Sequence, residues 1–150
     1  MALQNTIADL MLQTMNVVHR TVLTVSGGRL GSTMGNMPVF EVTTTGRTSG
    51  RPRTVMLTSP VQRDGALVFV ASKGGDDRDP DWYRNMVATP EFTARPVDGG
   101  DELALVARTA SADEKAALWP EIVETYSGYR GYQERTDREI PVVVAEPAGG

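Results

Sequence analysis

The sequence predicts a mainly β protein with flanking helices, an α+β chain in which an antiparallel sheet curls into a barrel. Six segments rich in β-branched and apolar residues are joined mostly by short turns, a pattern typical of antiparallel barrels. A doubly wound parallel sheet needs a crossover helix after nearly every strand, and the pattern lacks those helices. The 150 residues predict one domain, 1–150, long enough to bury a core of its own.

Residues 1–24 are predicted to form an N-terminal helix, because apolar residues from Leu3 to Val18 recur at steps of three and four. We expect this helix to pack on the core. The alternatives are a helix that lies on a membrane surface or over a substrate channel. The glycine-rich segment 25–37 is predicted to be a flexible loop, and the barrel core is expected to span 38–146.

The first half of that core is predicted to hold three strands, over 38–45, 53–61 and 66–72. The dipeptide Asp64-Gly65 between the second and third strands is a strong hairpin signal. A short helix is predicted next, with Asp79 as its N-cap and Pro80 at its first helical position. This helix is expected to end before Pro90.

The second half is predicted to begin with a hairpin of two strands, 91–97 and 102–109, joined by an Asp-Gly-Gly-Asp turn. Ser111 and Glu114 form the pattern of a capping box, so a helix is predicted from Ala112. Trp119-Pro120 is expected to kink or restart that helix. A buried last strand is predicted over 140–145.

Composition excludes several classes of function. The chain has no cysteine, which excludes disulfides, thiolate zinc sites, iron–sulfur clusters and a cysteine nucleophile. The single histidine, His19, disfavours a multi-histidine metal site, and we expect no metal. The formal net charge of −4 argues against nucleic-acid binding. The sequence shows neither a signal peptide nor an apolar run long enough to span a membrane, so a cytoplasmic protein is expected.

One turn concentrates positive charge. Arg47, Arg51 and Arg53 lie within seven residues that also hold Thr48, Ser49 and Gly50, and a second glycine, Gly46, directly precedes them. Guanidinium groups match the geometry of phosphate and carboxylate, and glycines let backbone N–H groups approach an anion. Two interpretations stay open on this spacing: a site for the anionic tail of a cofactor, or a solvated hairpin.

Two further segments are candidates for ligand contacts. Ser72 and Lys73 follow a predicted buried strand and precede Gly74-Gly75, so Lys73 can offer a point charge to a phosphate. The alternative is an ordinary loop lysine. Trp82 lies on the predicted short helix, where its ring can stack on a flat heterocycle or simply close the end of the barrel.

Three tyrosines, Tyr126, Tyr129 and Tyr132, are spaced by three residues. On one helix they would spiral over about a third of its circumference. Their phenols can border an apolar pocket and donate hydrogen bonds to an acceptor molecule; the alternative is ordinary amphipathic packing. Because acid–base and nucleophile motifs are missing, any difficult chemical step is expected to rest on a cofactor.

Four runs together resemble the deazaflavin-dependent nitroreductase family of actinobacteria. They are TTTGRTSGRPRTVML at 43–57, ASKGG at 71–75, PDWYRNM at 80–86 and REIPVVV at 138–144. Each run is weak alone, but the ordered set is specific and covers most of the chain from about 38 to 146. The resemblance implies an antiparallel split β-barrel, like that of FMN-binding split barrels, and the deazaflavin coenzyme F-420.

By this resemblance the anionic tail of F-420 would meet the arginine turn and the segment after the third strand. The implied cofactor-binding residues are Arg47, Thr48, Ser49, Gly50, Arg51, Arg53, Met56, Ala71, Ser72, Lys73, Gly74, Gly75 and Trp82. The implied catalytic residues, which face the acceptor, are Tyr126, Tyr129, Tyr132 and Ser72. The implied reaction moves a hydride from reduced F-420 to a quinone or another activated acceptor, including nitroaromatics. The N-terminal helix would suit a lipophilic quinone arriving from the inner face of the membrane.

The sequence departs from the family pattern at Thr48, where relatives often carry lysine. The acids of segment 76–79 are expected either to repel the anionic tail or to face outward and cap the following helix. Two other functions stay open: a non-catalytic deazaflavin carrier, and a reductase that uses FMN. The oligomeric state is not predicted.

Overall fold

The computed structural model describes residues 33–34 and 37–149. The predicted N-terminal helix over 1–24, the membrane contact expected of it and most of the 25–37 loop lie outside the described residues. Within that loop, Thr33–Met34 forms a short strand. None of the helices in the described ranges is both long and apolar enough to span a membrane.

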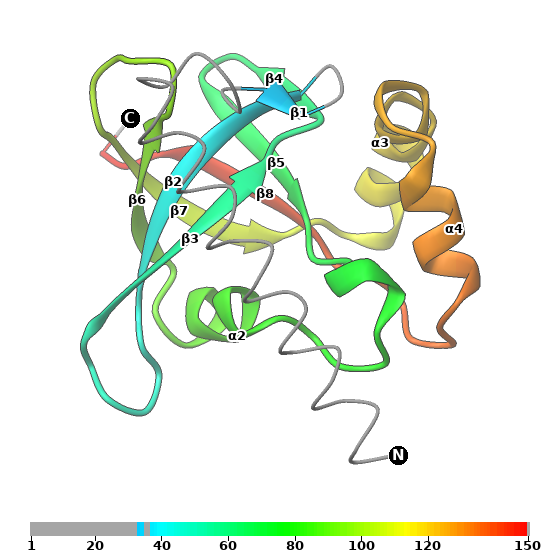
Figure 1. Cartoon of the computed structure of the whole chain (residues 1–150), viewed down its shortest axis with the longest axis horizontal. Helices are drawn as coiled ribbons and strands as arrows, with labels where there is room; N and C mark the ends of the chain where they lie inside the picture. The colour runs from blue at the N-terminus through cyan, green and yellow to red at the C-terminus, as the bar shows by residue number, and fades with distance from the viewer. Residues whose placement is uncertain (1–32, 35–36, 150) are drawn as a thin grey trace.

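Eight strands form one sheet in the described part of the chain. The sheet order is β1-β2-β6-β7-β8-β5-β4, and β3 pairs with the other side of β2. Every pairing is antiparallel, and the sheet curls on itself with α2 below it and α3 and α4 to one side (Figure 1). The strands are β1 Thr33–Met34, β2 Met37–Thr45, β3 Pro52–Thr58, β4 Val61–Arg63, β5 Ala66–Val70, β6 Glu91–Pro96, β7 Leu103–Thr109 and β8 Val142–Pro147. The predicted antiparallel, curled sheet is confirmed.

Four helical segments connect or flank these strands: η1 Lys73–Gly75, α2 Asp81–Ala88, α3 Ala112–Thr125 and α4 Gly128–Glu134. The predicted capping box at the start of α3 is confirmed. The Ser111 hydroxyl accepts a hydrogen bond from the Glu114 N–H at 3.2 Å, and the Glu114 carboxylate accepts one from the Ser111 N–H at 3.0 Å. The hairpin signal is confirmed too, because Asp64 and Gly65 both have positive φ, at 53° and 82°, as a tight two-residue turn requires.

The strand predicted over 53–61 is wrong as one element, because Ser59 and Pro60 separate β3 from β4. The Ser59 hydroxyl is fully buried and contacts the carbonyl oxygens of Val61 at 3.0 Å and Val68 at 2.7 Å. Its N–H donates to the carbonyl oxygen of Pro38 at 3.1 Å. These bonds turn the chain from β3 into β4, which pairs with β5. No local sequence pattern predicts them.

Two helix predictions also need correction. The N-cap of α2 is Pro80 rather than Asp79, because the Asp79 carboxylate instead accepts a hydrogen bond from Arg138 at 2.9 Å. Helix α3 does not restart at Pro120 but continues through it to Thr125. Burial of Ile122 and Val123 stabilises the turn beyond the proline, which offsets the backbone hydrogen bond that proline cannot make.

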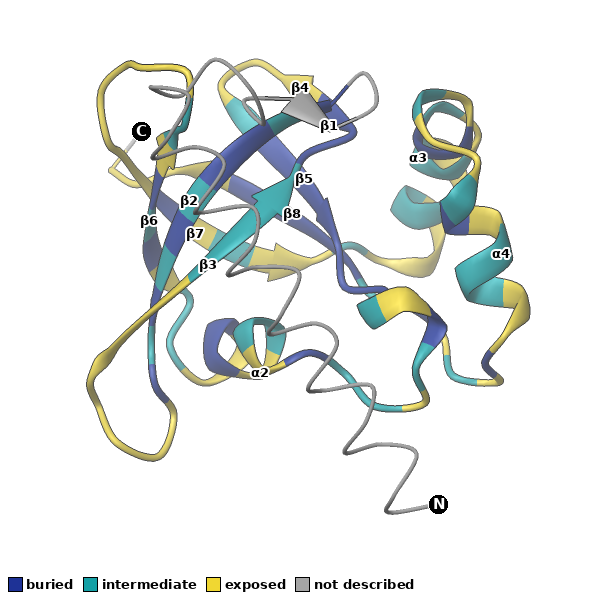
Figure 2. Cartoon of the chain, in the orientation of Figure 1, coloured by how far each residue is buried: buried dark blue, intermediate teal, exposed yellow. Residues whose placement is uncertain are grey.

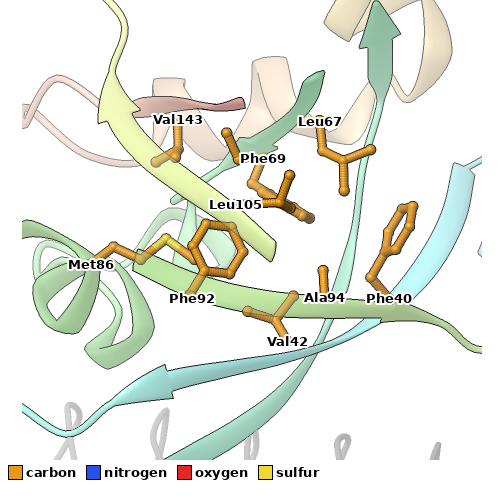
Figure 3. Packing of buried hydrophobic residues seen from close by; sticks show 10 residues of the cluster. Phe40, Val42, Leu67, Phe69, Met86, Phe92, Ala94, Leu105 and Val143 are labelled. Atoms are coloured by element: carbon orange, nitrogen blue, oxygen red, sulfur yellow. The ribbon is translucent and has the colours of Figure 1, made fainter. Parts of the chain in front are cut away.

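Two hydrophobic clusters lie on opposite faces of the sheet. The inner cluster fills the curl around Phe69, whose ring lies 6.2 Å from Phe40 and 6.4 Å from Phe92 between ring centroids (Figure 3). The outer cluster packs β5 and β8 against α3 and α4, and its buried members are Met37, Val61, Val68, Val70, Ile122, Tyr129, Ile140 and Val142. Figure 2 shows β5 and β8 as buried ribbon, whereas the tip of the β2–β3 hairpin is exposed.

The inner cluster sets the stability of the barrel. We expect Phe69→Ala to lower the free energy of unfolding by about 3–5 kcal/mol, because Phe69 is 1% exposed and its removal leaves a cavity. Val87, which is 62% exposed, supplies the control: Val87→Ala should change stability by about 0.5 kcal/mol or less. Urea unfolding followed by circular dichroism measures both. Equal losses in the two variants would contradict this assignment of the core.

Candidate functional site

The predicted site residues lie on the β2–β3 turn, β3, α2, the loop 71–79, and the segment from Tyr126 into α4. Figure 1 shows the turn beside α2, and η1 between α2 and α4. The turn is formed by Gly46, whose N–H donates to the Arg51 carbonyl at 2.8 Å, and by Gly50, whose N–H donates to the Gly46 carbonyl at 2.8 Å. Gly50 has a φ of +70° and open space around its Cα, so the outer side of the turn is free of side chains there.

Arg47 fastens the turn to α2. One guanidinium nitrogen donates to the Asn85 side-chain oxygen at 2.9 Å, and the other contacts the Asp81 carboxylate at 3.1 Å. The Asn85 oxygen also accepts from the Arg47 N–H at 3.2 Å, while the Asn85 amide donates to Thr44 at 3.1 Å. Asn85 is 4% exposed, so this buried amide fixes where the hairpin lies. Sequence analysis missed Asn85, although it belongs to the run PDWYRNM.

Arg51 and Arg53 differ from Arg47 in having no carboxylate partner among the described residues. Both are exposed, as are Thr48 and Ser49. The Ser49 hydroxyl accepts hydrogen bonds from the Arg51 N–H at 3.1 Å and the Arg53 guanidinium at 3.4 Å. The turn therefore presents two guanidinium groups to solvent, and the Ser49 hydroxyl contacts that of Arg53.

The segment after β5 is a left-handed turn. Ser72 is in the right-handed helical region, and Lys73, Gly74 and Gly75 follow with φ values of 46°, 64° and 87°. A lysine at positive φ is strained. The Cα of Gly74 has open space around it, whereas a Cβ on Gly75 would lie 2.9 Å from the Tyr132 carbonyl oxygen. The two glycines thus serve different needs: one leaves room at the surface, and the other lets α4 approach.

The acids of the 76–79 loop are paired within the protein. Asp76 contacts the Arg78 guanidinium at 3.1 Å, Asp77 accepts from the Thr136 hydroxyl at 2.7 Å, and Asp79 contacts Arg138 at 2.9 Å. Burial alone would raise the pKa of Asp76, but its hydrogen bonds with Arg78 outweigh burial and lower that pKa. None of these acids caps α2. Arginines balance the charges of Asp76 and Asp79, whereas Asp77 is bonded to a neutral hydroxyl.

The side chains of β3 link the arginine turn to the tyrosines. Val55 and Leu57 pack on the inner cluster, so alternation places Thr54, Met56 and Thr58 on the outer face. Thr54 contacts Thr43 of β2 at 3.1 Å between hydroxyl oxygens, and Thr58 contacts the Tyr129 hydroxyl at 3.2 Å. From Thr54 to Thr58 this outer face covers about 13 Å at the usual rise of a strand.

The three tyrosines pack ring against ring at the far end of this face. Their ring centroids lie 5.3 Å apart for Tyr126 and Tyr129, 6.1 Å for Tyr129 and Tyr132, and 6.4 Å for Tyr126 and Tyr132. They do not share one helix, since Tyr126 lies between α3 and α4. Tyr129 is 5% exposed and Tyr126 is 38% exposed, so the cluster runs from the core to the surface.

Hydrogen bonding and burial raise the pKa of two of these phenols. The hydroxyls of Tyr126 and Tyr132 lie 3.4 Å apart, and this hydrogen bond, with burial, raises the pKa of Tyr132 to about 12. Burial likewise raises the pKa of Tyr129. A raised pKa means that the neutral, proton-bearing form of these two phenols persists throughout the physiological pH range.

The remaining predicted residues, Trp82, Ala71 and Ser72, pack wholly or partly within the protein. Trp82 on α2 packs edge-to-face with Phe69 at a centroid distance of 6.3 Å, so one side of the indole closes the end of the barrel. Ala71 is fully buried, and Ser72 is buried as well. A separate surface cavity of about 210 Å³ lies between α2 and β7, where Met86 and Ala107 contribute to its lining. None of the predicted site residues lines that cavity.

Comparison of the fold places the chain among split-barrel proteins. The heme storage protein HutZ of Vibrio cholerae is 12% identical and superimposes with a TM-score of 0.52 over 75% of this chain and 82% of that chain, a likeness that concerns the fold alone. The structure of an F-420-H2 dependent reductase, FDR-A, is 40% identical with a TM-score of 0.64, over 73% of this chain and 94% of that chain. The predicted split-barrel fold is therefore confirmed.

The sequence comparisons define the family. The profile of the F-420H(2)-dependent quinone reductase family matches residues 15–147. An F-420H(2)-dependent quinone reductase of Mycobacterium tuberculosis is 37% identical over 141 residues, which cover 85% of this chain and 86% of that protein. A solved domain-swapped dimer is 36% identical with a TM-score of 0.66, over 89% of this chain and 99% of that chain. The chain belongs to the F-420H(2)-dependent quinone reductase family.

Gly128 makes the arrangement of the tyrosines possible. A Cβ at Gly128 would lie 2.4 Å from the Tyr126 ring, so Gly128→Ala should displace that ring and change the near-ultraviolet circular dichroism of the protein. Gly131 lies on the same helix with open space around it, so Gly131→Ala should leave the tyrosine signal unchanged and raise stability by about 0.5–1 kcal/mol. An unchanged tyrosine signal in Gly128→Ala would contradict the packing described here.

Proposed function

We propose that the protein transfers a hydride from reduced coenzyme F-420 to a quinone, and that nitroaromatic compounds serve as further acceptors. The observation that carries the proposal is the outer face of β3. It leads from the exposed arginine turn at one end to the tyrosine cluster at the other, where Thr58 contacts Tyr129. A cofactor with an anionic tail and a flat redox ring needs positively charged groups for the tail. Near the ring it needs hydrogen-bond donors that can hold the acceptor.

The residues at the turn fit the tail. F-420 carries a phosphate and several carboxylates, and Arg51 and Arg53 are exposed guanidinium groups with no carboxylate partner among the described residues. Arg47 is largely engaged with Asn85 and Asp81, so its contribution is to hold the turn in place as well as to add positive charge. Thr48, Ser49 and Gly50 offer hydroxyl and backbone donors on the same turn.

The residues in and beside the loop 71–79 fit the flat deazaflavin ring of F-420. Ser72, Lys73 and Gly74 form the left-handed turn beside α4, and the absence of side-chain atoms around Gly74 leaves room for a flat ligand. Met56 on the outer face of β3 and the exposed part of Trp82 are proposed to border the same space. Ala71 and Gly75 shape the backbone there rather than contact the ligand through side chains.

Bound reduced F-420 supplies the hydride. The chain's own residues then have to hold the acceptor, exclude water and supply a proton. The phenols of Tyr126 and Tyr132 donate hydrogen bonds to the acceptor oxygen on which negative charge develops, and Tyr129, hydrogen-bonded to Thr58, holds their rings in place. Because the pKa of Tyr132 is about 12, its proton is present for transfer at neutral pH.

Acceptor range follows from the same donors. A quinone carbonyl and a nitro group both present oxygen acceptors on a flat, electron-poor ring, and a phenol O–H can donate to either. The surface-exposed position of Tyr126 places one donor where acceptors of different size can reach it. Nitroaromatic reduction is therefore proposed as a second activity of the same site.

Equilibrium titration with F-420 and with FMN tests the cofactor. We expect F-420 to bind at least about tenfold more tightly than FMN, because FMN lacks the tail carboxylates. The double variant Arg51→Ala/Arg53→Ala should raise the Kd for F-420 by about tenfold or more, as expected for the loss of charge-assisted hydrogen bonds. The double variant Arg63→Ala/Arg95→Ala, which changes exposed arginines on β4 and β6, removes the same number of charges and controls for net charge. Tighter binding of FMN, or no change in Arg51→Ala/Arg53→Ala, would contradict the proposed cofactor site.

Steady-state reduction of menadione and of a nitroaromatic compound tests the acceptor end. The variant Tyr126→Phe/Tyr132→Phe should lower kcat by about 10² with either acceptor, the usual contribution of a positioned proton donor, while the Kd for F-420 stays unchanged. Tyr83→Phe, which removes a hydroxyl bonded to Thr109 at 2.8 Å, is the control and should retain activity. Tight F-420 binding by a wild-type protein that reduces no acceptor would instead favour a deazaflavin carrier.

A further inference from the structure

Arg138 makes the densest set of hydrogen bonds around the loop 71–79. It follows α4 and precedes β8, and its side chain is 15% exposed. Its guanidinium donates to the carbonyl oxygens of Ala71 at 3.2 Å, Ser72 at 2.9 Å and Asp76 at 2.8 Å. It also contacts the Asp79 carboxylate at 2.9 Å. One side chain therefore holds both ends of the left-handed turn.

The turn needs such support because its backbone is strained. Lys73 has a φ of 46° and is followed by two glycines with positive φ. A non-glycine residue in this region is strained and persists only where its surroundings fix it. The carbonyls that Arg138 binds, those of Ala71, Ser72 and Asp76, bracket the strained residues 73–75. Within the turn, the N–H groups of Gly75 and Asp76 donate to Ser72 and Lys73 at 2.9 and 3.1 Å.

The loop 71–79 also contacts α4, the helix that holds Tyr129 and Tyr132, and the residues that follow it. Arg135 donates to the Gly74 carbonyl at 3.4 Å, and Thr136 donates to Asp77 at 2.7 Å. The Tyr132 carbonyl lies 2.9 Å from where a Cβ on Gly75 would be, so backbone meets backbone there. A change in the turn would therefore move the end of α4 and with it the ring of Tyr132.

We propose that Arg138 is a positioning residue for both halves of the proposed site: it fixes the loop 71–79 for the cofactor and, through α4, the tyrosines for the acceptor. This inference rests on the proposed function. Arg138 itself contacts neither ligand, since its donors are directed to the loop carbonyls and Asp79. Its effect is geometric, so a lysine that keeps the charge cannot replace it, because an ammonium lacks the planar fork that reaches four oxygens.

The test compares Arg138→Lys with Arg108→Lys. Arg108 is also a two-sided clamp, bonded to Glu114 and Glu146 at 2.7 Å each, but it joins β7 to α3 and β8 rather than to the loop. Amide hydrogen exchange of the free protein, F-420 titration and quinone kinetics are measured on both. For Arg138→Lys we expect faster exchange across 71–79, a Kd for F-420 raised about tenfold or more, and a raised KM for the quinone. Arg108→Lys should leave all three unchanged even where its melting temperature falls equally.

Unchanged loop exchange together with wild-type affinity in Arg138→Lys would overturn the inference, as would equal loss of affinity in Arg108→Lys. If Arg138→Lys fails to fold, Asp79→Asn removes only the charged partner and should raise the Kd for F-420 about two- to fivefold with faster loop exchange; wild-type behaviour in that variant would overturn the inference. Failure of the wild-type protein to bind F-420 is distinguishable, because it is seen before any variant is made. It would overturn the proposed function and this inference with it.

Discussion

The structure depends on two strands that are buried on both faces. Alternate residues of β5 belong to different clusters: Leu67 and Phe69 fill the barrel, while Val68 and Val70 pack against α3 and α4. The neighbouring strand β8 is shared in the same way. Because β5 contributes side chains to both clusters, a shift of α3 or α4 would disturb the packing of the barrel. The sheet therefore also fixes the position of the tyrosine cluster. This constraint positions the tyrosines of the proposed acceptor end.

Local chemistry explains how much of the fold could be predicted. The Asp64-Gly65 turn and the Ser111–Glu114 capping box are complete within four residues, and both are found where the sequence predicted them. Most of the corrections involve distant partners. Ser59 divides the strand predicted over 53–61, where its hydroxyl meets the Val68 carbonyl. The tyrosine spacing suggested one helix, yet the chain leaves α3 at Tyr126, where Gly128 lets the ring fold back.

In the candidate site, too, local features could be predicted from the sequence and contacts between distant residues could not. Residue types and spacing were sufficient to single out the arginine turn, the segment after β5 and the tyrosines. Their roles toward ligands stay predictions. What spacing could not reveal is that Arg47 is bound to Asn85, 38 residues away, or that Arg138 holds Ser72, 66 residues away. Both arginines lie in or beside quoted motifs, so the motifs identify important residues without telling which ones support the fold and which ones remain exposed.

Charge pairing distinguishes the arginines that support the fold from the arginines that remain exposed. Asp76, Asp79 and Asp81 are paired with Arg78, Arg138 and Arg47, while Asp77 accepts a hydrogen bond from the neutral Thr136 hydroxyl. Arg47 and Arg138 are therefore engaged within the protein, whereas Arg51 and Arg53 stay exposed on the turn. In a sequence of net charge −4, this pairing offsets three of the acids nearest the proposed anion site and leaves two guanidinium groups for the proposed ligand.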